Sequence, residues 1–228
     1  MHHFIHGDYL LSSRNFLNSL IEQEKRQNKE VVRLDGNSLA LNDLIQALAS
    51  NSLFGGEKVV VIENLFSRQK SKDQEILLEW IKTFDGQTPV IFWEKKTIGK
   101  ILQRRLPKKT TVKEFKTPAT VFKLVELLSP QTKKQALQLL EETVVKEPAE
   151  FLFAMICRQI RLMLLLKEGQ AVGGAPWMVG KLKKQAASFN KDELINSYQK
   201  LYFIDKQIKT GKTLMPLSWH LSVWISEL

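Results

Sequence analysis

The sequence has little cysteine and no long hydrophobic run. Cys157 is the only cysteine among 228 residues, so an intramolecular disulfide is impossible. Apolar runs are interrupted within about eight residues, whereas a membrane-spanning helix needs about 20. The amino-terminal end lacks the basic region, apolar core and small-residue cleavage site of a secretion signal. We therefore expect a soluble protein of the reducing cytoplasm, without membrane contact.

The sequence also lacks a phosphate-binding loop. Such a loop needs the pattern G-x-x-x-x-G-K-[ST] after the first strand, because backbone N–H groups and a lysine must converge on the phosphates. The first strand-to-helix turn contains Gly7 alone, and the strand "KVVVI" is followed by Glu63 and Asn64 rather than by two carboxylates. The Gly-Lys-Thr tripeptide at 211–213 follows a helical run, and Lys206 occupies the place of its first glycine. These absences argue against ATP hydrolysis.

Other catalytic arrangements are missing as well. Three of the four histidines, His2, His3 and His6, lie at an amino-terminal end that we expect to be flexible. Neither a cysteine nor a spaced carboxylate completes a metal site with them. Cys157 lies in the apolar run "FLFAMICRQI", where a core role is typical, and no histidine accompanies it as a base. We therefore predict a non-enzyme with no metal and no cofactor.

Acidic residues are scarce in one segment of a chain whose net charge is already +10. Between residues 95 and 116, nine lysines and arginines accompany a single acid, Glu114. A solvated surface explains such a run, and so does contact with DNA or with an acidic partner protein; both interpretations stay open. The candidate contact residues are Lys100, Arg104, Arg105, Lys108 and Lys109.

Strand-like and helix-like segments alternate in the first half of the chain. We predict strands at 4–5, 31–34, 58–62, 89–93 and 111–115. Helices are predicted between them, at 9–29, in a segment with apolar residues at 41, 44, 45 and 48, at 74–83 and at 100–106. The core candidates of the first helix are Leu10, Leu17, Leu20 and Ile21. Alternation of this kind is typical of an α/β fold, here a five-stranded parallel sheet covered on both faces.

Strand patterns end at residue 117. The remainder predicts helices at 119–128, 132–145, 149–167, 175–188, 191–209 and 217–227, separated by proline and glycine. The helix at 149–167 is apolar nearly all round and is expected at the centre of an all-α domain. We therefore divide the chain into an α/β domain, residues 1–117, and a helical domain, residues 118–228.

A pair of large apolar residues, Leu53 and Phe54, occupies the connection before the strand at 58–62. If the preceding helix continued, Leu53 would lie about 140° from Leu48 and Phe54 about 120° away on the other side, so neither belongs to the buried stripe. We expect Asn37 and Ser38 to cap this helix at its start. The pair is either an exposed anchor for a partner protein or a lid folded back on the core, and both interpretations stay open.

Several stretches together resemble the delta subunit of the bacterial DNA polymerase III clamp loader. These stretches are "HGDYLL", "VVRLDG", "LFGGEKVVVIENL", "CRQIRLMLLLKEG" and "YFIDKQIKTGK". The resemblance covers most of the chain and implies a P-loop-NTPase-like (AAA+-like) sheet domain without ATPase activity, followed by a collar-like helical domain. Family members usually carry a helical lid domain between the two, whereas "KEFKTPATVFKLV" passes almost directly from the last strand to the collar-like helices.

The resemblance also implies a function. A delta subunit binds the ring-shaped sliding clamp (beta) with an exposed apolar pair, which corresponds to Leu53 and Phe54 here, and holds the ring open. The implied partners are the clamp, the ATP-hydrolysing loader subunits and DNA threaded through the assembled complex. The alternative from another class is a stand-alone basic nucleic-acid-binding protein on a degenerate P-loop-like scaffold. A nucleotide hydrolase with an unrecognised site is the least favoured interpretation.

Overall fold

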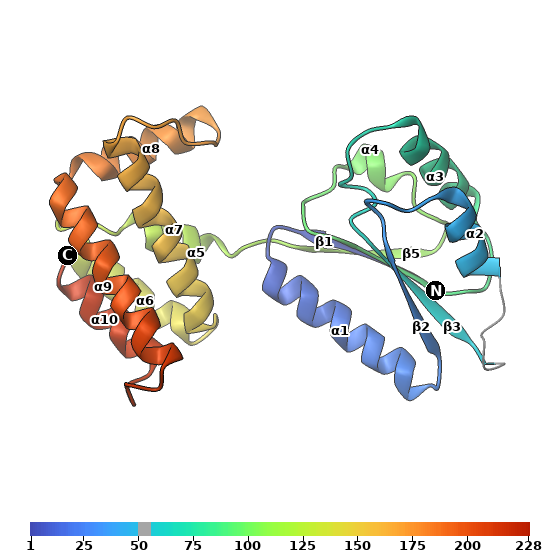
Figure 1. The fold of residues 1–228 in the computed structure, drawn as a ribbon, viewed down its shortest axis with the longest axis horizontal. Helices are drawn as coiled ribbons and strands as arrows, with labels where there is room; N and C mark the ends of the chain where they lie inside the picture. Colours follow the sequence, from blue (N-terminus) through green and yellow to red (C-terminus); the bar gives the residue numbers. More distant parts are fainter. Residues whose placement is uncertain (50–55) are drawn as a thin grey trace. The chain divides into compact units, whose positions relative to one another are not determined.

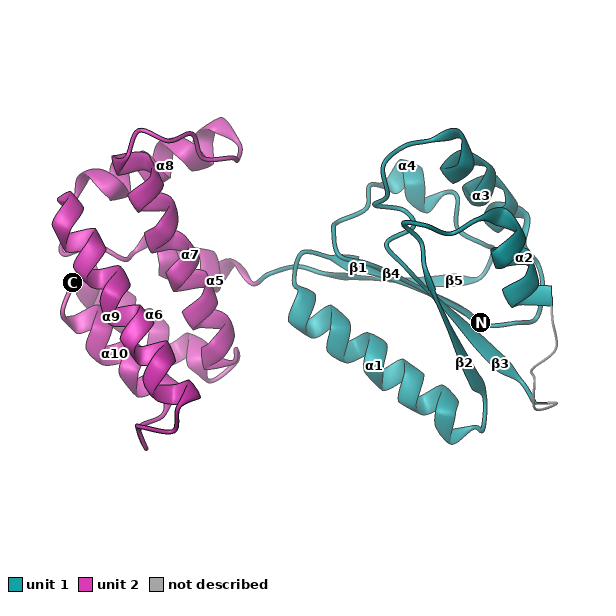
Figure 2. Cartoon of the chain, in the orientation of Figure 1, with its two compact units in different colours: residues 1–117 teal, residues 118–228 magenta. Residues whose placement is uncertain are grey.

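A computed structural model of the chain describes residues 1–49 and 56–228. The chain divides into residues 1–117 and residues 118–228, which have separate colours in Figure 2. The first unit alternates strands and helices, and the second is built from helices. The predicted fold class, an α/β sheet part followed by a helical part, is confirmed. None of the described helices is long and apolar enough to cross a bilayer.

All five strands of the first unit run parallel in one sheet of order β2-β3-β4-β1-β5. The strands are β1 (His2–Gly7), β2 (Glu30–Asp35), β3 (Lys58–Glu63), β4 (Val90–Glu94) and β5 (Thr110–Phe115). Because β1 lies between β4 and β5, the amino-terminal residues are interior to the sheet and not at its edge. Phe4 is in register with Phe92 of β4 on one side and with Val112 of β5 on the other.

Helices cover both faces of the sheet (Figure 1). They are α1 (Leu10–Arg26), α2 (Leu41–Ala49), α3 (Lys72–Thr83) and α4 (Lys100–Gln103). The β-branched run of β3 shows why two layers are needed, because successive side chains of a strand point to opposite faces. Val59 and Val61 pack with Leu17 of α1, whereas Val60 and Ile62 belong to the core beneath α2 and α3.

The second unit consists of six helices around one apolar core. They are α5 (Ala119–Glu126), α6 (Lys133–Val144), α7 (Ala149–Lys167), α8 (Pro176–Ala187), α9 (Lys191–Lys209) and α10 (Leu217–Ser226). Helix α7 packs against α5, α8, α9 and α10, and Leu152, Ile156, Ile160 and Met163 are completely buried in it. Its predicted central place in the helical part is therefore confirmed. Residues 116–118 alone connect β5 to α5, so there is no lid-sized insertion at this point.

Several predicted bounds were wrong for local reasons. The first helix ends at Arg26 and not at residue 29, because Asn28 has a φ of 59°, in the left-handed region. Leu10, predicted to be in the core, is 47% exposed at the start of that helix, while Leu17 and Ile21 are buried as predicted. Helix α4 ends at Gln103 and not at residue 106, because the N–H groups of Arg105 and Leu106 bond to carbonyls three residues back and not four.

Candidate functional site

The predicted partner-binding pair, Leu53 and Phe54, lies outside the described residues. The elements on either side locate the connection that carries it. Helix α2 ends at Ala49, and Leu48 is buried, with its carbonyl oxygen accepting a hydrogen bond from the Thr88 hydroxyl at 3.2 Å. Strand β3 begins at Lys58. The connection therefore enters the sheet at the amino end of β3, opposite the carboxyl ends at which parallel sheets usually bind small ligands.

The turn between β1 and α1 takes the place of a phosphate loop and makes different contacts. Gly7 has a φ of 137°, and a Cβ atom added to it would lie 1.8 Å from the carbonyl oxygen of Phe115. The Gly7 N–H donates to the Lys96 carbonyl at 3.2 Å, and the Tyr9 N–H donates to the Phe115 carbonyl at 3.1 Å. These amides hold the ends of β4 and β5, so neither of them is available to cradle a phosphate.

A carboxylate of the same turn makes it still less suited to an anion. Asp8 accepts a hydrogen bond from the Thr117 N–H at 2.8 Å through its side chain. The negative charge of Asp8 at the start of α1 would repel a phosphate that approached the helix end. Asp8 and Gly7 together fasten the turn to residues 115–117, where the first unit ends. A glycine is therefore needed at position 7 because the turn packs closely against the backbone of Phe115, and not because it binds a nucleotide.

Glu63, at the carboxyl end of β3, is engaged by arginines. Its carboxylate lies 2.7 Å from a guanidinium nitrogen of Arg14 and 3.9 Å from one of Arg33. The Arg14 guanidinium also lies over the Trp93 ring, 3.6 Å from the centroid. These contacts give Glu63 a structural role. Among the described residues, no group of three or more histidines, cysteines and acids is arranged to hold a metal ion.

Glu94 is a structural carboxylate that the sequence analysis missed. Glu94 is fully buried at the end of β4, and its two oxygens accept hydrogen bonds from the N–H groups of Phe66 at 2.7 Å and Ser67 at 2.9 Å. Burial raises the pKa of this carboxyl group, while the hydrogen bonds from Ser67 and Phe66 oppose the shift. The signal was present in the sequence: an acid directly ends the otherwise apolar strand "PVIFW".

The expectation of a flexible, histidine-bearing amino-terminal end was wrong. His2, His3 and His6 belong to β1, and His2 and His6 are buried. The His2 Nδ1 accepts a hydrogen bond from the Val90 N–H at 3.2 Å, and the His6 Nδ1 accepts one from the Ile98 N–H at 3.3 Å. Burial lowers the pKa of all three imidazoles. The neutral rings thus connect β1 to the residues around β4.

These contacts predict a pH dependence of stability. A histidine whose pKa is lowered by folding stays neutral in the native state while the unfolded chain takes up a proton. The free energy of unfolding of residues 1–117 should therefore decrease as the pH falls below about 6.5. Urea unfolding at a series of pH values measures this decrease in the free energy of unfolding. His6→Asn, which keeps an acceptor near the Nδ1 position, should reduce this decrease.

A matched variant in the second unit is the control for His6→Asn. Glu94, whose raised pKa acts in the opposite sense, is present in both variants and in the wild type. His220→Asn, in the second unit, should leave the pH dependence of residues 1–117 as in the wild type. Two results together would contradict the role assigned to the imidazoles. The wild-type free energy of unfolding would stay constant or rise as the pH falls through this range, and His6→Asn would behave in the same way.

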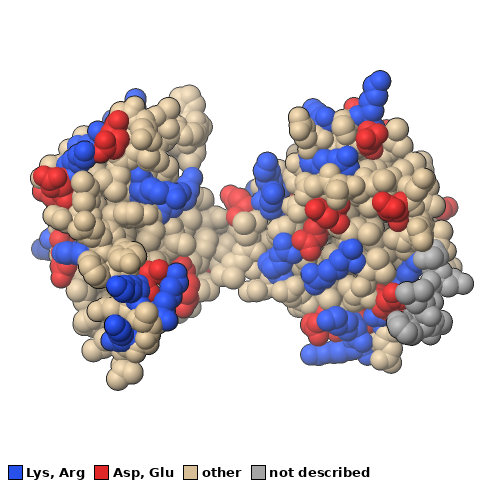
Figure 3. Space-filling view, viewed as in Figure 1, with Lys and Arg blue, Asp and Glu red and all other residues tan. Residues whose placement is uncertain are grey.

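The basic segment does not form a single surface. Arg105 pairs with Glu79 of α3, Lys113 lies over the Phe16 ring at 3.8 Å, and Lys116 lies 3.2 Å from Glu114. The remaining candidates are exposed around α4 and the turn before β5: Lys100, Arg104, Lys108 and Lys109. Strand β5, roughly 17 Å long at about 3.3 Å per residue, separates Lys108 and Lys109 before its start from Lys116 after its end. Figure 3 likewise shows acids interspersed with lysines and arginines on the face drawn.

The "IDKQIKTGK" stretch forms the end of helix α9. Asp205 and Lys209 are ion-paired at 2.8 Å one turn apart, and the Thr210 hydroxyl donates to the Lys206 carbonyl at 2.7 Å. Gly211 follows with a φ of 64°, a left-handed conformation that commonly ends helices. The Gly-Lys-Thr tripeptide is thus part of a helix terminus, as its sequence context predicted. Large side chains are exposed around this end: Tyr202, Phe203, Leu214, Met215 and Trp219.

Comparisons with known proteins match both units. The family model described as DNA polymerase III, delta subunit, matches residues 8–125, and the model of its C-terminal domain matches residues 119–222. Among solved structures, the Bacillus subtilis DNA clamp loader delta protein (YqeN) is similar with a TM-score of 0.47 and 16% identity. That match covers 99% of this chain and 94% of the other. A comparison with curated protein sequences found no match.

The assignment to a family rests on the two family models. Together they extend over both the sheet and the helical unit, and the first alone covers more than half of the chain. The delta-subunit model includes the β1–α1 turn, the connection before β3 and the basic segment; the C-terminal model includes the "IDKQIKTGK" stretch. The chain therefore belongs to the delta-subunit family of DNA polymerase III, a family of non-catalytic clamp-loader components.

Proposed function

We propose that this chain binds the DNA polymerase sliding clamp through Leu53 and Phe54 and helps to open the ring for loading onto primed DNA during replication in the cytoplasm. The observation that carries the proposal is the family match, which spans the sheet unit and the helical unit. The pair precedes β3 in the sequence, so the chain reaches the sheet after it at the amino end of that strand and not at the carboxyl, ligand-binding end. An apolar anchor in that place suits a protein surface better than a small molecule.

The work of ATP hydrolysis belongs, in this proposal, to other loader subunits. The β1–α1 turn supports this division, because its Gly7 and Tyr9 amides and its Asp8 carboxylate are bonded to residues 96, 115 and 117. A nucleotide would have to displace these contacts and overcome the charge of Asp8. The chain would then act as a binding subunit that holds one clamp interface open while its neighbours hydrolyse ATP.

The helical unit would join those neighbours. Its collar-like helices expose large apolar side chains at the end of α9 and the start of α10, including Phe203 at 57%, Met215 at 51% and Trp219 at 47%. Exposed apolar groups gathered in one region are typical of protein-binding surfaces. We propose that this region contacts an adjacent ATPase subunit in a pentameric loader, and that the short connection at 116–118 replaces the usual lid.

The proposal is tested by mixing the purified chain with the purified sliding clamp of the same organism. Size-exclusion chromatography should show a stable complex without ATP, and addition of the loader ATPase should produce a larger assembly. A chain that elutes separately from the clamp in every mixture would contradict the proposal. If primed DNA is added to the same mixtures, its binding by the chain in the absence of clamp binding would favour the second candidate function.

That second candidate, direct DNA binding, is favoured by the exposed cations around α4. Charge reversal of Lys100, Arg104, Lys108 and Lys109 should leave clamp binding intact and weaken DNA binding by the assembled loader. The slope of log affinity against log salt concentration should fall by about 0.9 for each phosphate that the variant no longer neutralises. Fluorescence anisotropy with primed DNA at several salt concentrations measures both quantities.

A matched variant controls for total charge. Reversal of four exposed lysines of the second unit, Lys134, Lys146, Lys183 and Lys212, changes the net charge equally. Equal loss of DNA affinity in both variants would show that bulk charge, rather than a contact around α4, attracts the DNA. Tight DNA binding by the chain alone, without clamp or loader, would make the stand-alone interpretation the better one.

A further inference from the structure

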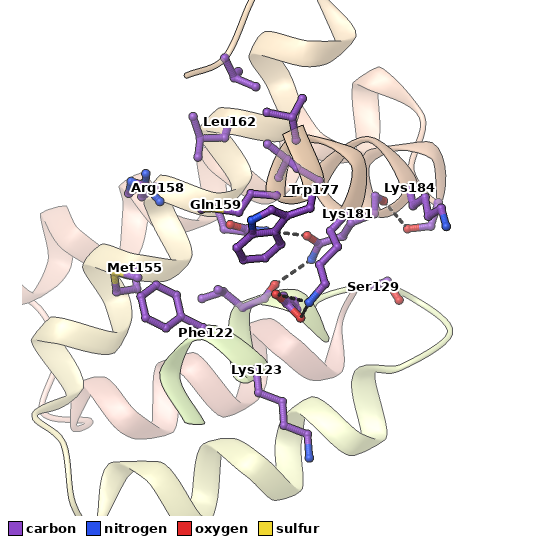
Figure 4. Close-up of a pocket in the computed structure, with 18 of the residues that line it drawn as sticks. Phe122, Lys123, Ser129, Met155, Arg158, Gln159, Leu162, Trp177, Lys181 and Lys184 are labelled. Atoms are coloured by element: carbon purple, nitrogen blue, oxygen red, sulfur yellow. Dashed lines mark hydrogen bonds and ion pairs between the residues drawn. The ribbon is translucent and has the colours of Figure 1, made fainter. Parts of the chain in front are cut away.

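The second unit contains a groove between helices α5, α7 and α8. Its volume is about 850 Å³, and all the residues that line it belong to the helical unit. Apolar side chains from the three helices form its centre: Phe122 of α5, Met155 and Leu162 of α7, and Trp177, Met178 and Val179 of α8. Figure 4 shows the Trp177 indole within this group, with Phe122 and Met155 in the same part of the view.

Three of these large apolar side chains are exposed to solvent. Trp177 is 64% exposed, Met178 is 41% exposed and Phe122 is 38% exposed. The buried core of the same unit reaches the groove at Leu182 of α8, which is both a core residue and a lining residue. Contiguous apolar groups that remain in water at the mouth of a hollow are typical of a protein-binding surface. The groove therefore has the composition of an interface.

A hydrogen-bonded glutamine fixes the shape of the groove. The Gln185 side chain donates to the carbonyl oxygens of Val125 at 2.7 Å and Leu128 at 2.9 Å. Its own carbonyl oxygen accepts a hydrogen bond from the Gln159 side chain at 2.6 Å. One residue of α8 is thereby bonded to the end of α5 and to α7. A groove held in this way is preformed, which lowers the entropic cost of binding.

The rim of the groove is cationic. Four basic side chains line it, Lys123, Arg158, Lys181 and Lys184, whereas Glu126 is the single acid among the lining residues. Glu126 is ion-paired with Lys181, whose ammonium lies 2.9 Å from both carboxylate oxygens. Lys181 also approaches the Trp177 ring at 5.6 Å. In Figure 4 Arg158 lies to the left of the Trp177 indole, Lys184 to its right and Lys123 below Phe122, so basic residues lie on several sides of the apolar group.

We propose that this groove binds an acidic amphipathic helix of a partner protein. The apolar centre would receive one face of the helix, and Lys123, Arg158 and Lys184 would pair with carboxylates on its flanks. The exposure of Trp177 favours a macromolecular occupant, because a small-molecule site encloses its aromatic residues more completely. Helix α8 has 12 residues, or about 18 Å, so the occupant should contribute three to four turns. The inference goes beyond the proposed clamp function and does not depend on it.

Selection from a displayed peptide library tests the inference on the full chain. The library encodes helical peptides of about 16 residues with apolar residues at random spacings and with acidic, basic and neutral flanks. The groove should enrich sequences with an apolar stripe of helical period and acidic flanking residues. Enriched peptides are then synthesised, and their affinity is measured by fluorescence anisotropy.

Two groove variants and two matched controls decide the outcome. Trp177→Ala and the pair Lys123→Glu with Lys184→Glu should each weaken binding by about tenfold or more. Trp219→Ala and the pair Lys134→Glu with Lys183→Glu alter exposed residues outside the groove and should leave binding unchanged. Equal effects of groove and control variants, or enrichment of basic or unpatterned sequences, would overturn the inference. Clamp binding by the groove variants should remain normal. A failure of the clamp proposal can therefore be told apart from a failure of the groove inference.

Discussion

Replacing Leu53 and Phe54 together by alanine is expected to abolish clamp binding while both units remain folded. Adjacent large apolar side chains can serve as an anchor whose truncation costs about 2–4 kcal/mol or more. At 1.4 kcal/mol per tenfold change, the dissociation constant should rise by about 30-fold to several hundredfold. Titration calorimetry of the chain with the purified clamp measures the change directly.

The pair Leu10 and Leu11 provides a matched control. These leucines are 47% and 39% exposed at the start of α1, so their joint replacement by alanine removes a similar apolar area from the same unit. We expect this control to bind the clamp as the wild type does. Normal clamp binding by the Leu53 and Phe54 variant would contradict the assignment of that pair.

Urea unfolding of the same variant distinguishes the two interpretations of Leu53 and Phe54. An exposed anchor contributes little to the stability of residues 1–117, so the unfolding midpoint should stay close to that of the wild type. A lid folded on the core would instead lower the free energy of unfolding by about 2–5 kcal/mol, as truncation of buried leucine or phenylalanine does. In that case a loss of clamp binding could come from the destabilised fold and would not identify a contact.

Gly7→Ala is expected to be among the most destabilising single substitutions in the first unit. The added Cβ would lie 1.8 Å from the Phe115 carbonyl oxygen and 2.6 Å from its carbon, and both are backbone atoms that cannot rotate away. The φ of 137° is also unfavourable for alanine. We expect a loss of about 3–5 kcal/mol in the free energy of unfolding of residues 1–117.

Gly180→Ala is the control for this substitution. Gly180 lies inside helix α8, and nothing is within 4 Å of a Cβ added there. Alanine at an open helical position should stabilise its unit by about 0.5–1 kcal/mol. The two variants are compared by urea unfolding. Wild-type stability of Gly7→Ala would show that the β1–α1 turn tolerates a side chain, and the structural explanation of its glycine would then fail.

Local patterns were sufficient to predict the helices and the parallel class of the sheet. The uninterrupted β-branched residues of β3 indicated a strand covered on both faces, and its valines do alternate between two cores. The predicted helices of the second unit agree with the observed ones to within two residues at each end. Proline and glycine between them supplied these limits, because both residues act through their own backbone geometry.

Long-range pairing explains what could not be predicted. His2 and His6 looked like polar residues of a loose end, but their strand is interior because it pairs with β4 and β5, which lie far away in the sequence. Glu94 is buried because the amides of Phe66 and Ser67 come from a distant loop. Asn37 was predicted as a helix cap, yet its amide groups bond Asp35 within the turn after β2.

The basic segment is a candidate site that contacts between distant residues divide in a way that the sequence could not predict. Nine cations that are near one another in the sequence are distributed by strand β5, by the ion pair of Arg105 with Glu79, and by the contact of Lys113 with Phe16. Net charge along a sequence cannot show this division, because it depends on which side chains the fold brings together. The Leu53 and Phe54 assignment, in contrast, stays a prediction because both residues lie outside the described part of the chain.

Release of clamp rings from circular DNA tests most directly whether this chain opens the sliding clamp, as we propose. Labelled clamps are loaded on nicked circular DNA, the loader is removed, and the purified chain is added without ATP. We predict that the wild-type chain accelerates the release of rings and that the Leu53→Ala, Phe54→Ala variant does not. Rings that remain on the DNA at their spontaneous rate while the wild-type chain is bound to them would contradict the account.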